Sequence, residues 1–493
     1  MIKIVDLFAG PGGLGEGFSG LTDAAGRRRF ELGLSIEKDR FAHETLRLRA
    51  FRRRFDDKLP AAYDRFVRGE LDWSSLAAQS PSPARTAAAE ALRIELGADG
   101  VTAVRDLIRA VVPRNDRWVL IGGPPCQAYS LVGRARNNGK RGYVPDQDHR
   151  QTLYIEYLQI LADHAPPVFV MENVKGLLSA QLDSSGLFER IRTDLNNPAA
   201  ALMREGRRSS GRRPRYDVRA LAPGPHTTDD DARRYIVRSE LFGVPQRRHR
   251  VILVGVRSDL PSSSLPTLVE HRKQATVAEQ LRGLPRVRSG LSKTPDDDAA
   301  WLAAVMGVRN RGWLADVDPD VRRRIREVVA NLRAPVASRG GEVLAGRDGI
   351  LVLNHSTRGH IVEDLDRYLF ASSFAQIRWH SPVLAEYPTA LLPAHANIGR
   401  AVHEAVFVDR FRVQLAHQPS TTITSHISKD GHYYIHSDPS QCRSLTVREA
   451  ARLQTFPDDY FFCGPRTAQY QQVGNAVPPA LAAQIASAIT HLL

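Results

Sequence analysis

The chain has 493 residues and a formal net charge of +14, with 68 Lys and Arg against 54 Asp and Glu. Its three cysteines are too few, and odd in number, for the disulfide framework of a small secreted domain. No apolar run approaches the length of a membrane-spanning helix, so a membrane protein is also excluded. The basic balance predicts attraction to phosphate, and with it a nucleic-acid partner whose binding weakens with salt.

The N-terminus predicts a strand, a glycine loop and a helix in succession. Residues 2–8 are mostly apolar and rich in β-branched side chains, and Gly10, Gly12 and Gly15 then satisfy the pattern G-x-G-x-x-G. Glycines let the backbone turn tightly and approach a ligand, while free N–H groups at a helix start attract negative charge. This segment therefore predicts a cofactor loop, although the glycine pattern alone is a weak signal.

A second apolar run, 32–36, ends at Glu37. A carboxylate about 20 residues beyond a glycine loop can accept hydrogen bonds from ribose hydroxyls. Glu37 therefore favours an adenosine-containing cofactor. The alternative is that Glu37 caps the next helix, predicted over 41–49.

The apolar run 118–121 predicts a buried strand that ends in Gly122-Gly123-Pro124-Pro125-Cys126. Proline fixes φ and removes a hydrogen-bond donor, so the Pro-Pro pair holds the Cys126 thiol in a stiff loop. Such rigidity suits a nucleophile. The alternative interpretation is a small buried cysteine at a tight turn.

Two further strand ends carry charged side chains. The apolar run 167–171 is broken by Glu172, and a carboxylate at such a place needs a partner. The segment 244–250 leads into the strand 251–256, where alternation puts Arg248 and Arg250 on one face. Alternatively, these arginines form a solvated surface. The thiol and the acid at other strand ends favour a functional role for the arginines.

Four segments, taken in chain order, resemble the DNA cytosine-5 methyltransferase family of bacterial type. They are the glycine loop, the Pro-Pro-Cys segment, the strand that ends at Glu172 and the arginine-bearing segment 244–250. Near the C-terminus, 443–457 looks like the family's ninth conserved block and 472–479 like its tenth. The resemblance implies an α/β fold: a Rossmann-like S-adenosylmethionine-dependent methyltransferase sheet with a smaller, irregular target-recognition domain. It places the catalytic domain at 1–258 and the target-recognition domain at 259–419. Residues 420–493 would then return to complete the catalytic domain.

The resemblance also implies the chemistry. A cytosine flipped out of duplex DNA would receive the methyl group of S-adenosylmethionine at C5. Cys126 would attack C6 to form a covalent adduct, and Glu172 would hold or donate a proton at N3. Arg248 and Arg250 would lie near the cytosine carbonyl, where planar and permanently charged donors are useful.

Further residues take binding roles by the same resemblance. The predicted cofactor-binding residues are Phe8, Gly10, Gly12, Glu37, Asp106, Pro124 and Asn475. The predicted DNA-binding residues lie on a loop that closes over the flipped base: Gln127, Ser130, Arg134 and Arg136. For Asp106 a surface helix is an equally good interpretation, because the stretch 49–116 is longer than the family's compact form. For Arg134 or Arg136 taken singly, an ordinary solvated loop is equally good.

Several other segments carry weaker predictions. Residues 204–215 hold clustered arginines and predict a DNA-facing arm, and 296–332 reads as helical. The polar segment 354–360 has groups able to meet a base edge or a phosphate, with metal binding by its histidines as the rival interpretation. Residues 426–434 predict a hairpin around an Asp-Gly turn. We expect no metal, because no cysteine or acid stands at ligand spacing.

We expect a cytoplasmic bacterial enzyme, nucleoid-associated when bound to double-stranded DNA and acting as a monomer. Met1 is followed at once by the cofactor strand, so no signal peptide is expected. The setting would be restriction–modification or phage defence, with a restriction or defence-system protein as a partner.

Three alternatives remain. An NAD oxidoreductase explains the glycine loop but not Cys126 and Glu172. A transfer-RNA cytosine methyltransferase would keep the chemistry, whereas a non-enzymatic DNA-binding relative should have lost the cysteine or the acid.

Overall fold

The computed structural model describes residues 1–55, 58–97, 100–112, 117–124, 149–179, 181–182, 185–209, 211–222, 231–261, 266–332, 343–345, 351–393 and 410–493. The chain divides into two compact units. The first unit comprises Met1–Leu59, Ala77–Lys273 and Ala476–Leu493, and the second unit comprises Pro60–Leu76 and Gln274–Asn475.

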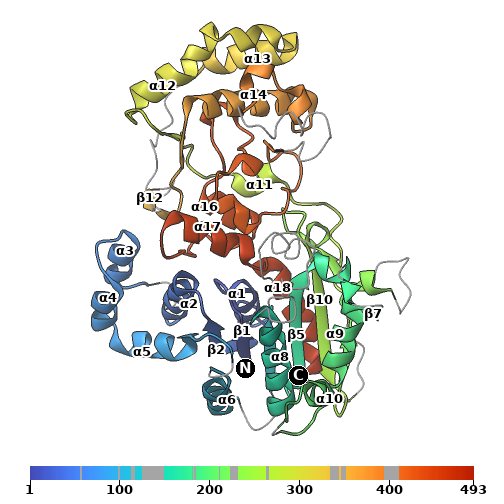
Figure 1. The fold of residues 1–493 in the computed structure, drawn as a ribbon. Coiled ribbons are helices and arrows are strands. Elements are labelled where there is room, and N and C mark those ends of the chain that lie inside the picture. The colour runs from blue at the N-terminus through green and yellow to red at the C-terminus, as the bar shows by residue number, and fades with distance from the viewer. Residues whose placement is uncertain are drawn as a thin grey trace. The chain divides into compact units, whose positions relative to one another are not determined.

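The first unit is built on one sheet with the strand order β3-β2-β1-β4-β5-β10-β8, and β9 pairs with β10 (Figure 1). Strands β1 to β5 are parallel, while β10 runs antiparallel to β5, β8 and β9. The predicted Rossmann-like α/β fold is thereby confirmed. The strands are β1 (Ile2–Leu7), β2 (Phe30–Glu37), β3 (Ala91–Arg93), β4 (Trp118–Gly122), β5 (Val168–Val174), β8 (Tyr216–Arg219), β9 (Ile236–Arg238) and β10 (His249–Arg257).

Helices cover both faces of this sheet because its central strands are apolar on both sides. Alternate residues of β1 enter different cores: Ile4 packs with α1 and α18, whereas Val5 packs in the core that contains α8 and α9 residues. The helices of the first unit are α1 (Gly13–Ser19), α2 (Arg40–Arg52), α5 (Pro81–Glu90), α6 (Gly100–Val111), α8 (His149–His164), α9 (Leu187–Asn196), α10 (Pro198–Arg204) and α18 (Pro479–Ile489). Two short strands, β6 (Gln181–Leu182) and β7 (Ser185–Gly186), pair beside them.

The C-terminal segment packs directly on the N-terminal glycine loop (Figure 1). A Cβ on Gly13 would lie 2.1 Å from the Val477 carbonyl oxygen, and one on Gly17 would lie 2.2 Å from that of Pro479. Glycine is therefore required at both positions by the close approach of α1 to α18. Two of the glycines around the loop thus serve helix packing and not a ligand.

The second unit has a helical core and little sheet. Its helices are α3 (Ala61–Val67), α11 (Val277–Leu281), α12 (Asp298–Met306), α13 (Pro319–Ala330), α14 (Val362–Arg378), α16 (Val447–Leu453) and α17 (Arg466–Asn475), and α4 (Trp73–Gln79) crosses the boundary to the first unit. The short strands β11 (Gly290–Leu291) and β14 (Gly359–His360) pair, as do β12 (Val343–Ala345) and β13 (Leu351–Leu353). The helical prediction for 296–332 is confirmed by α12 and α13.

The hairpin prediction for 426–434 is wrong. Gly431 does turn the chain, with φ +80°, but 3₁₀ helices at Ser425–Ser428 and His432–Tyr434 flank it. The Asp-Gly pair gives the turn, but the residues after it bond to other segments: the Arg412 amide donates to the His432 carbonyl, and the Leu445 amide donates to the Tyr434 carbonyl.

The returning segment of the first unit is shorter than the sequence predicted. The first unit takes up the chain again at Ala476, whereas 420–475, including the ninth-block helix α16, lies in the second unit. Helix α16 contacts α11 and α17, which also belong to the second unit. Which unit performs which function stays a prediction.

No helix in the described ranges is long and apolar enough to cross a membrane.

Candidate active site

Strand order fixes where a ligand can enter the first unit. β1 lies between β2 and β4, so the connections that leave β1 and β4 turn away from each other at the carboxyl edge of the sheet. A crevice at such a switch point is the usual ligand site of an open parallel sheet. The loop after β1 and the Gly123-Pro124 segment after β4 both start there.

The loop after β1 has the backbone conformation that its glycines allow. Phe8, Gly10 and Gly12 all have positive φ, of 56°, 57° and 92°, and Gly12 is the N-cap of α1. A Cβ on Gly10 would meet no atom within 4 Å, so this side of the loop is open. Left-handed backbone at Phe8 is rare for a bulky side chain, and such strain is concentrated at functional sites.

The Glu37 carboxylate forms a hydrogen bond with the glycine loop after β1. One oxygen accepts a hydrogen bond from the Gly10 amide at 2.8 Å, and the other accepts from the amides of Lys38 and Asp39. Burial raises the pKa of Glu37. The cap of α2 is Asp39, whose side chain accepts from Phe41 and Ala42. The alternative that Glu37 caps α2 is therefore wrong, and its carboxylate faces the glycine loop as the cofactor interpretation requires.

Asp6 is a second acid under the loop that sequence reasoning missed. It is 1 % exposed on β1, and a Cβ on Gly15 would lie 3.0 Å from one of its carboxyl oxygens. Burial, and then the charge of Glu37, raise the pKa of Asp6 well above its ordinary value. A lone acid inside an apolar strand was the available signal.

Glu172 and Arg250 meet at the same edge. The two are diagonal neighbours on β5 and β10, because Glu172 pairs with Ile252 and Arg250 with Val174. Arg250 Nε lies 2.8 Å from Glu172 Oε1, and both side chains are nearly buried, at 12 % and 14 % exposure. The other carboxylate oxygen would lie 2.9 Å from a Cβ on Gly123. The acid is thus held against the start of the segment that leads to Cys126.

Asn173 fixes the same segment from the neighbouring position. Its side-chain amide donates to the Pro124 carbonyl at 3.1 Å, and its side-chain oxygen accepts from the Val174 amide. Pro124 is buried. The role of Asn173 was missed although it stands beside Glu172 in the sequence. Cys126, Gln127, Ser130, Arg134 and Arg136 lie outside the described residues.

Arg248 is placed more deeply than Arg250. Its side chain is 1 % exposed, and its backbone amide donates to Ser239 Oγ and to the Gln246 carbonyl. Ser239 Oγ in turn donates to the Gln246 carbonyl at 2.8 Å. Arg248 therefore precedes β10 in a tightly bonded turn, which fixes the point from which Arg250 reaches Glu172.

Two predicted cofactor residues are not brought to this edge by the first unit. Asp106 lies on the exposed face of α6, where it accepts from Arg109 at 3.0 Å, so the structure favours the surface-helix interpretation. Asn475 is the exposed last residue of α17 in the second unit. It directly precedes Ala476, where the first unit resumes.

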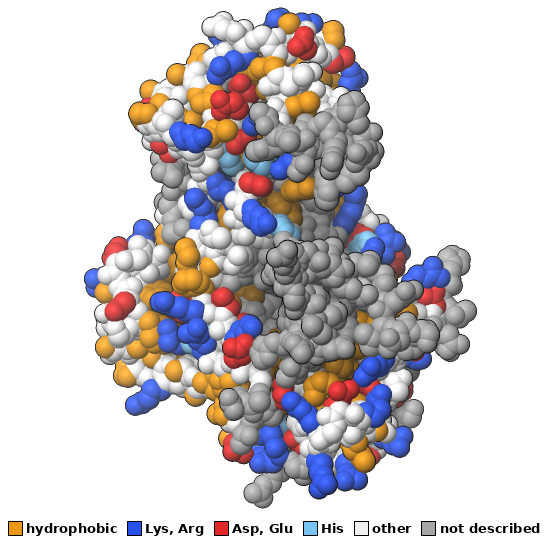
Figure 2. All heavy atoms as spheres, in the orientation of Figure 1, with side chains coloured by type: hydrophobic (Ala, Val, Ile, Leu, Met, Phe, Trp, Pro, Cys, Tyr) orange, Lys and Arg blue, Asp and Glu red, His pale blue; other side chains and the backbone are white. Residues whose placement is uncertain are grey.

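The arginine-rich segment 204–215 lies at the opposite edge of the sheet. Ser209 Oγ donates to the Ala162 carbonyl, at the end of α8 that leads into the start of β5. Arg204 pairs with Asp194 and Arg207 with Glu156, so part of its charge is neutralised. Figure 2 shows Lys and Arg side chains spread among acidic ones on the visible face of each unit, and not gathered in one stripe.

The polar segment 354–360 of the second unit is turned inward. His355 is fully buried: its Nε2 donates to the Pro285 carbonyl and its Nδ1 accepts from Thr446 Oγ1. Burial lowers the pKa of His355 to about 4, so the ring is neutral. Asn354 bonds Phe462 in both directions. The prediction that this segment meets bases or phosphates is wrong for these two residues, since their polar groups are already satisfied.

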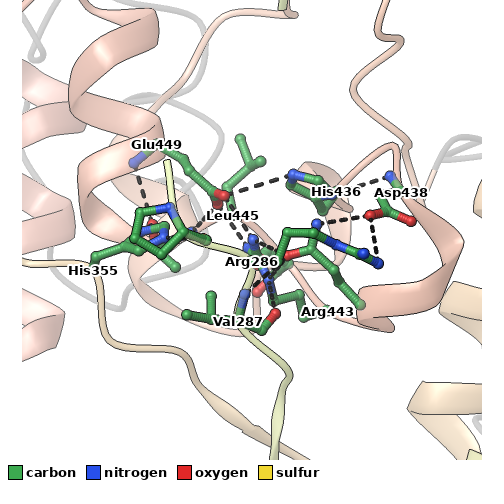
Figure 3. A network of polar contacts seen from close by, with 12 residues as sticks. Arg286, Val287, His355, His436, Asp438, Arg443, Leu445 and Glu449 are labelled. Atoms are coloured by element: carbon green, nitrogen blue, oxygen red, sulfur yellow. Dashed lines mark hydrogen bonds and ion pairs between the residues drawn. The ribbon is translucent and has the colours of Figure 1, made fainter. Parts of the chain in front are cut away.

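A buried ion pair organises the same region (Figure 3). Arg443 donates two hydrogen bonds to the Glu449 carboxylate, at 2.6 and 2.7 Å, and a third to the Val287 carbonyl. Glu449 also completes the capping box of α16 with Thr446. His436 points at Glu449 from 3.6 Å. The ninth-block residues thus join segments that are far apart in the sequence, and within the described residues no group of His, Cys, Asp and Glu is arranged to hold a metal.

Comparison with known proteins decides the family. The model of the family described as C-5 cytosine-specific DNA methylase matches residues 106–197 and 233–491, more than half of the chain. The chain belongs to this family. It is 30 % identical to the type II methyltransferase M.Bpa9945I of Bacillus paralicheniformis, over 99 % of both chains. It is 26 % identical to the DNA (cytosine-5-)-methyltransferase M.ApeKI of Aeropyrum pernix, over 77 % of this chain and 82 % of that one.

A solved structure agrees with the fold. An E. coli prophage protein described as a DNA modification methyltransferase superposes with a TM-score of 0.51, at 18 % identity, over 100 % of this chain and 99 % of that one. The family membership and the enzyme class, DNA cytosine-5 methyltransferase, confirm the resemblance that the four sequence segments gave.

Proposed function

We propose that this methyltransferase modifies C5 of a cytosine flipped out of a specific double-stranded DNA sequence, through a covalent adduct with Cys126. The observation that carries this is the contact of one Glu172 carboxylate oxygen with Arg250, together with the position of the other oxygen, which would lie 2.9 Å from a Cβ on Gly123. This arrangement brings a permanently charged donor and a carboxylate close to Gly123, where the segment that leads to Cys126 begins. C6 of a stacked cytosine is out of reach of such a loop, so the base must leave the helix.

The reaction needs electrons in the ring before C5 can act as a nucleophile. The Cys126 thiolate adds to C6, and the electron pair displaced from the C5–C6 bond is stabilised by a proton held at N3 by Glu172. C5 then takes up the methyl group. A base removes the C5 proton, the C5–C6 double bond reforms and the thiolate leaves. Arg250 keeps the Glu172 carboxylate in place and presents its remaining donors toward the cytosine carbonyl.

The residues of the first unit fit S-adenosylmethionine. The open loop at Gly10 and Gly12 would hold its methionine end, Glu37 its ribose and Phe8 its adenine. Pro124 would lie beside the cofactor. The raised pKa of Glu37 is compatible with this role, because either form of the carboxyl can bond a hydroxyl. When bound, the cofactor supplies the methyl group. Asn475 is proposed as a further contact from the tenth block.

The setting that we propose is restriction–modification, with phage defence as its purpose. The relatives' designation as type II methyltransferases supports this. A restriction or defence-system protein would be the functional partner, and the enzyme would act on DNA as a monomer.

Bisulfite sequencing of plasmid DNA from a host that expresses the chain tests the proposal. Methylated cytosines in one short motif are expected, together with a loss of roughly 10³-fold or more in the Cys126→Ser variant. Binding of S-adenosylmethionine to the purified variant serves as the control for folding. Unmethylated DNA from a folded, cofactor-binding parent protein would contradict the proposal and favour an RNA substrate.

A further inference from the structure

Trp379 of the second unit combines two unfavourable features. It is 66 % exposed, whereas Trp118, Trp301 and Trp313 are at most 5 % exposed. It also ends α14 with φ 62° and ψ 12°, in the left-handed region. A helix end of this conformation usually carries glycine, because a bulky side chain is strained there. The fold itself would therefore be served better by a small residue at this position.

The strain has one parallel in the chain. Among the described residues, only two aromatic side chains stand on left-handed backbone, Phe8 and Trp379. Phe8 belongs to the proposed cofactor site. Strained backbone is concentrated at active sites and ligand-binding segments. Trp379 has no such ligand assigned to it.

The surroundings of Trp379 suit a nucleotide. Its ring lies 4.9 Å from that of His417 at an interplanar angle of 66°, so the two rings form a corner with an open face. His417 is exposed and lies 3.1 Å from the side-chain nitrogen of Gln418. Gln is a side chain that can bond the edge of adenine in two places, and an exposed guanidinium meets phosphate. The neighbouring Arg378 is 41 % exposed, and its guanidinium pairs with Asp318.

The corner is also held firmly in place. The Trp379 amide donates to the Ala375 carbonyl, and Ser381 Oγ accepts from the Val413 amide at 2.9 Å. Arg378 pairs with Asp318 at 2.6 Å. The end of α14 and the strand-like segment at Val413 are thus fixed to each other, and the Trp379 ring is presented on a rigid support.

We infer that Trp379 stacks on a base of the DNA substrate, with His417 and Gln418 beside it as contacts to the same or the adjoining nucleotide. The inference rests on the proposed function. A stacked tryptophan suits a base that has been unstacked or displaced, because every base presents a π-face. Trp379 is then a DNA-binding residue of the second unit, distinct from the residues that act on the target cytosine.

Three variants separate this role from a structural one. Trp379→Gly removes the ring and relieves the strained backbone, so its Tm should not fall by more than about 2 °C. Its KM for a short duplex with the mapped motif should rise ~10-fold or more, with kcat nearly unchanged. Trp379→Phe keeps a ring and should retain a KM within about 3-fold of the parent value. Met306→Ala, at another exposed apolar side chain, should leave KM unchanged.

Fluorescence gives a readout that does not depend on turnover. Titration with the duplex should quench tryptophan emission of the parent protein. The quenching should be lost in Trp379→Phe and kept in a Trp73→Phe control. An unchanged KM in Trp379→Gly, or quenching that survives in Trp379→Phe, would overturn the inference while leaving the proposed function intact. A change of oligomeric state in Trp379→Gly would overturn it in favour of a protein contact. If the parent protein methylates no DNA, the proposed function and this inference fail together.

Discussion

Arginine–carboxylate pairs occur in both units, but they are built differently. Arg250 and Glu172 meet at the carboxyl edge of a sheet, where Arg250 Nε lies 2.8 Å from Glu172 Oε1 and the two side chains are 12 % and 14 % exposed. Arg443 and Glu449 are at most 2 % exposed, and two parallel hydrogen bonds join them. The Arg250–Glu172 pair keeps hydrogen-bond donors and acceptors that a substrate could contact. In the Arg443–Glu449 pair, both carboxylate oxygens are bonded to the guanidinium.

The difference follows from what each unit has to stabilise it. In the first unit, the strands of one sheet satisfy many of each other's backbone groups. The second unit has long irregular segments, and their backbone carbonyls need donors. Arg448, for example, donates to the carbonyls of Leu353 and Pro457. In the second unit, Arg448 thus bonds backbone carbonyls of irregular segments, whereas Arg250 of the first unit bonds the carboxylate of Glu172 at the sheet edge.

Glu172→Gln should give the largest effect. The amide keeps a hydrogen-bond acceptor for Arg250 but cannot hold a transferable proton, so kcat should fall by ~10²–10⁴-fold. The Tm should stay near that of the parent protein. Single-turnover methyl transfer and thermal unfolding measure the two quantities. A large drop in Tm with little loss of rate would place this pair in the same class as Arg443 and Glu449.

Glu449→Gln should show the reverse pattern. It leaves the Arg443 guanidinium buried without a counter-charge and weakens the capping box of α16, at a cost of ~3–5 kcal/mol in the free energy of unfolding. Urea unfolding measures this. Asp458→Asn is the matched control: it removes an exposed partner of Arg452, so we expect a cost of ~0–1 kcal/mol. Equal costs for the two variants would refute the structural role of the buried pair.

Gly123→Ala should give a smaller effect that sharpens the comparison further. The added methyl group would lie 2.9 Å from Glu172 Oε2 and must displace the carboxylate, so we expect a loss of about 10-fold in kcat. Because the end of a side chain can move, stability should change little. Gly186→Ala, where a methyl group meets no atom within 4 Å, is the control. Full activity in Gly123→Ala would show that the position of the carboxylate is not critical.

Local patterns predicted most of the first unit. Glu37, Pro124 and Glu172 were found because each interrupts or follows an apolar run, and Arg250 because it precedes one. The parallel strands end, and the antiparallel strand β10 begins, at the same edge of the sheet. Asp6 and Asn173 were missed because their contacts depend on which segments meet in the fold, although Asp6 interrupts an apolar run and Asn173 follows Glu172 in the sequence. For Asp106, the sequence left open a cofactor contact or a surface helix, and the fold favours the helix.

The sequence by itself determined the family, the Rossmann-like sheet and the order of the segments that carry its motifs, because these depend on short patterns of apolar runs and loop residues. Only the tertiary structure decided that the glycines at 13 and 17 serve α18, that the unit boundary falls at Ala476, and that His355 is a buried neutral ring. It also set Trp379 on the surface while three other tryptophans were buried. These properties depend on which distant segments meet. A side chain of the same type can bind a ligand where it is exposed and supports the fold where other segments bury it.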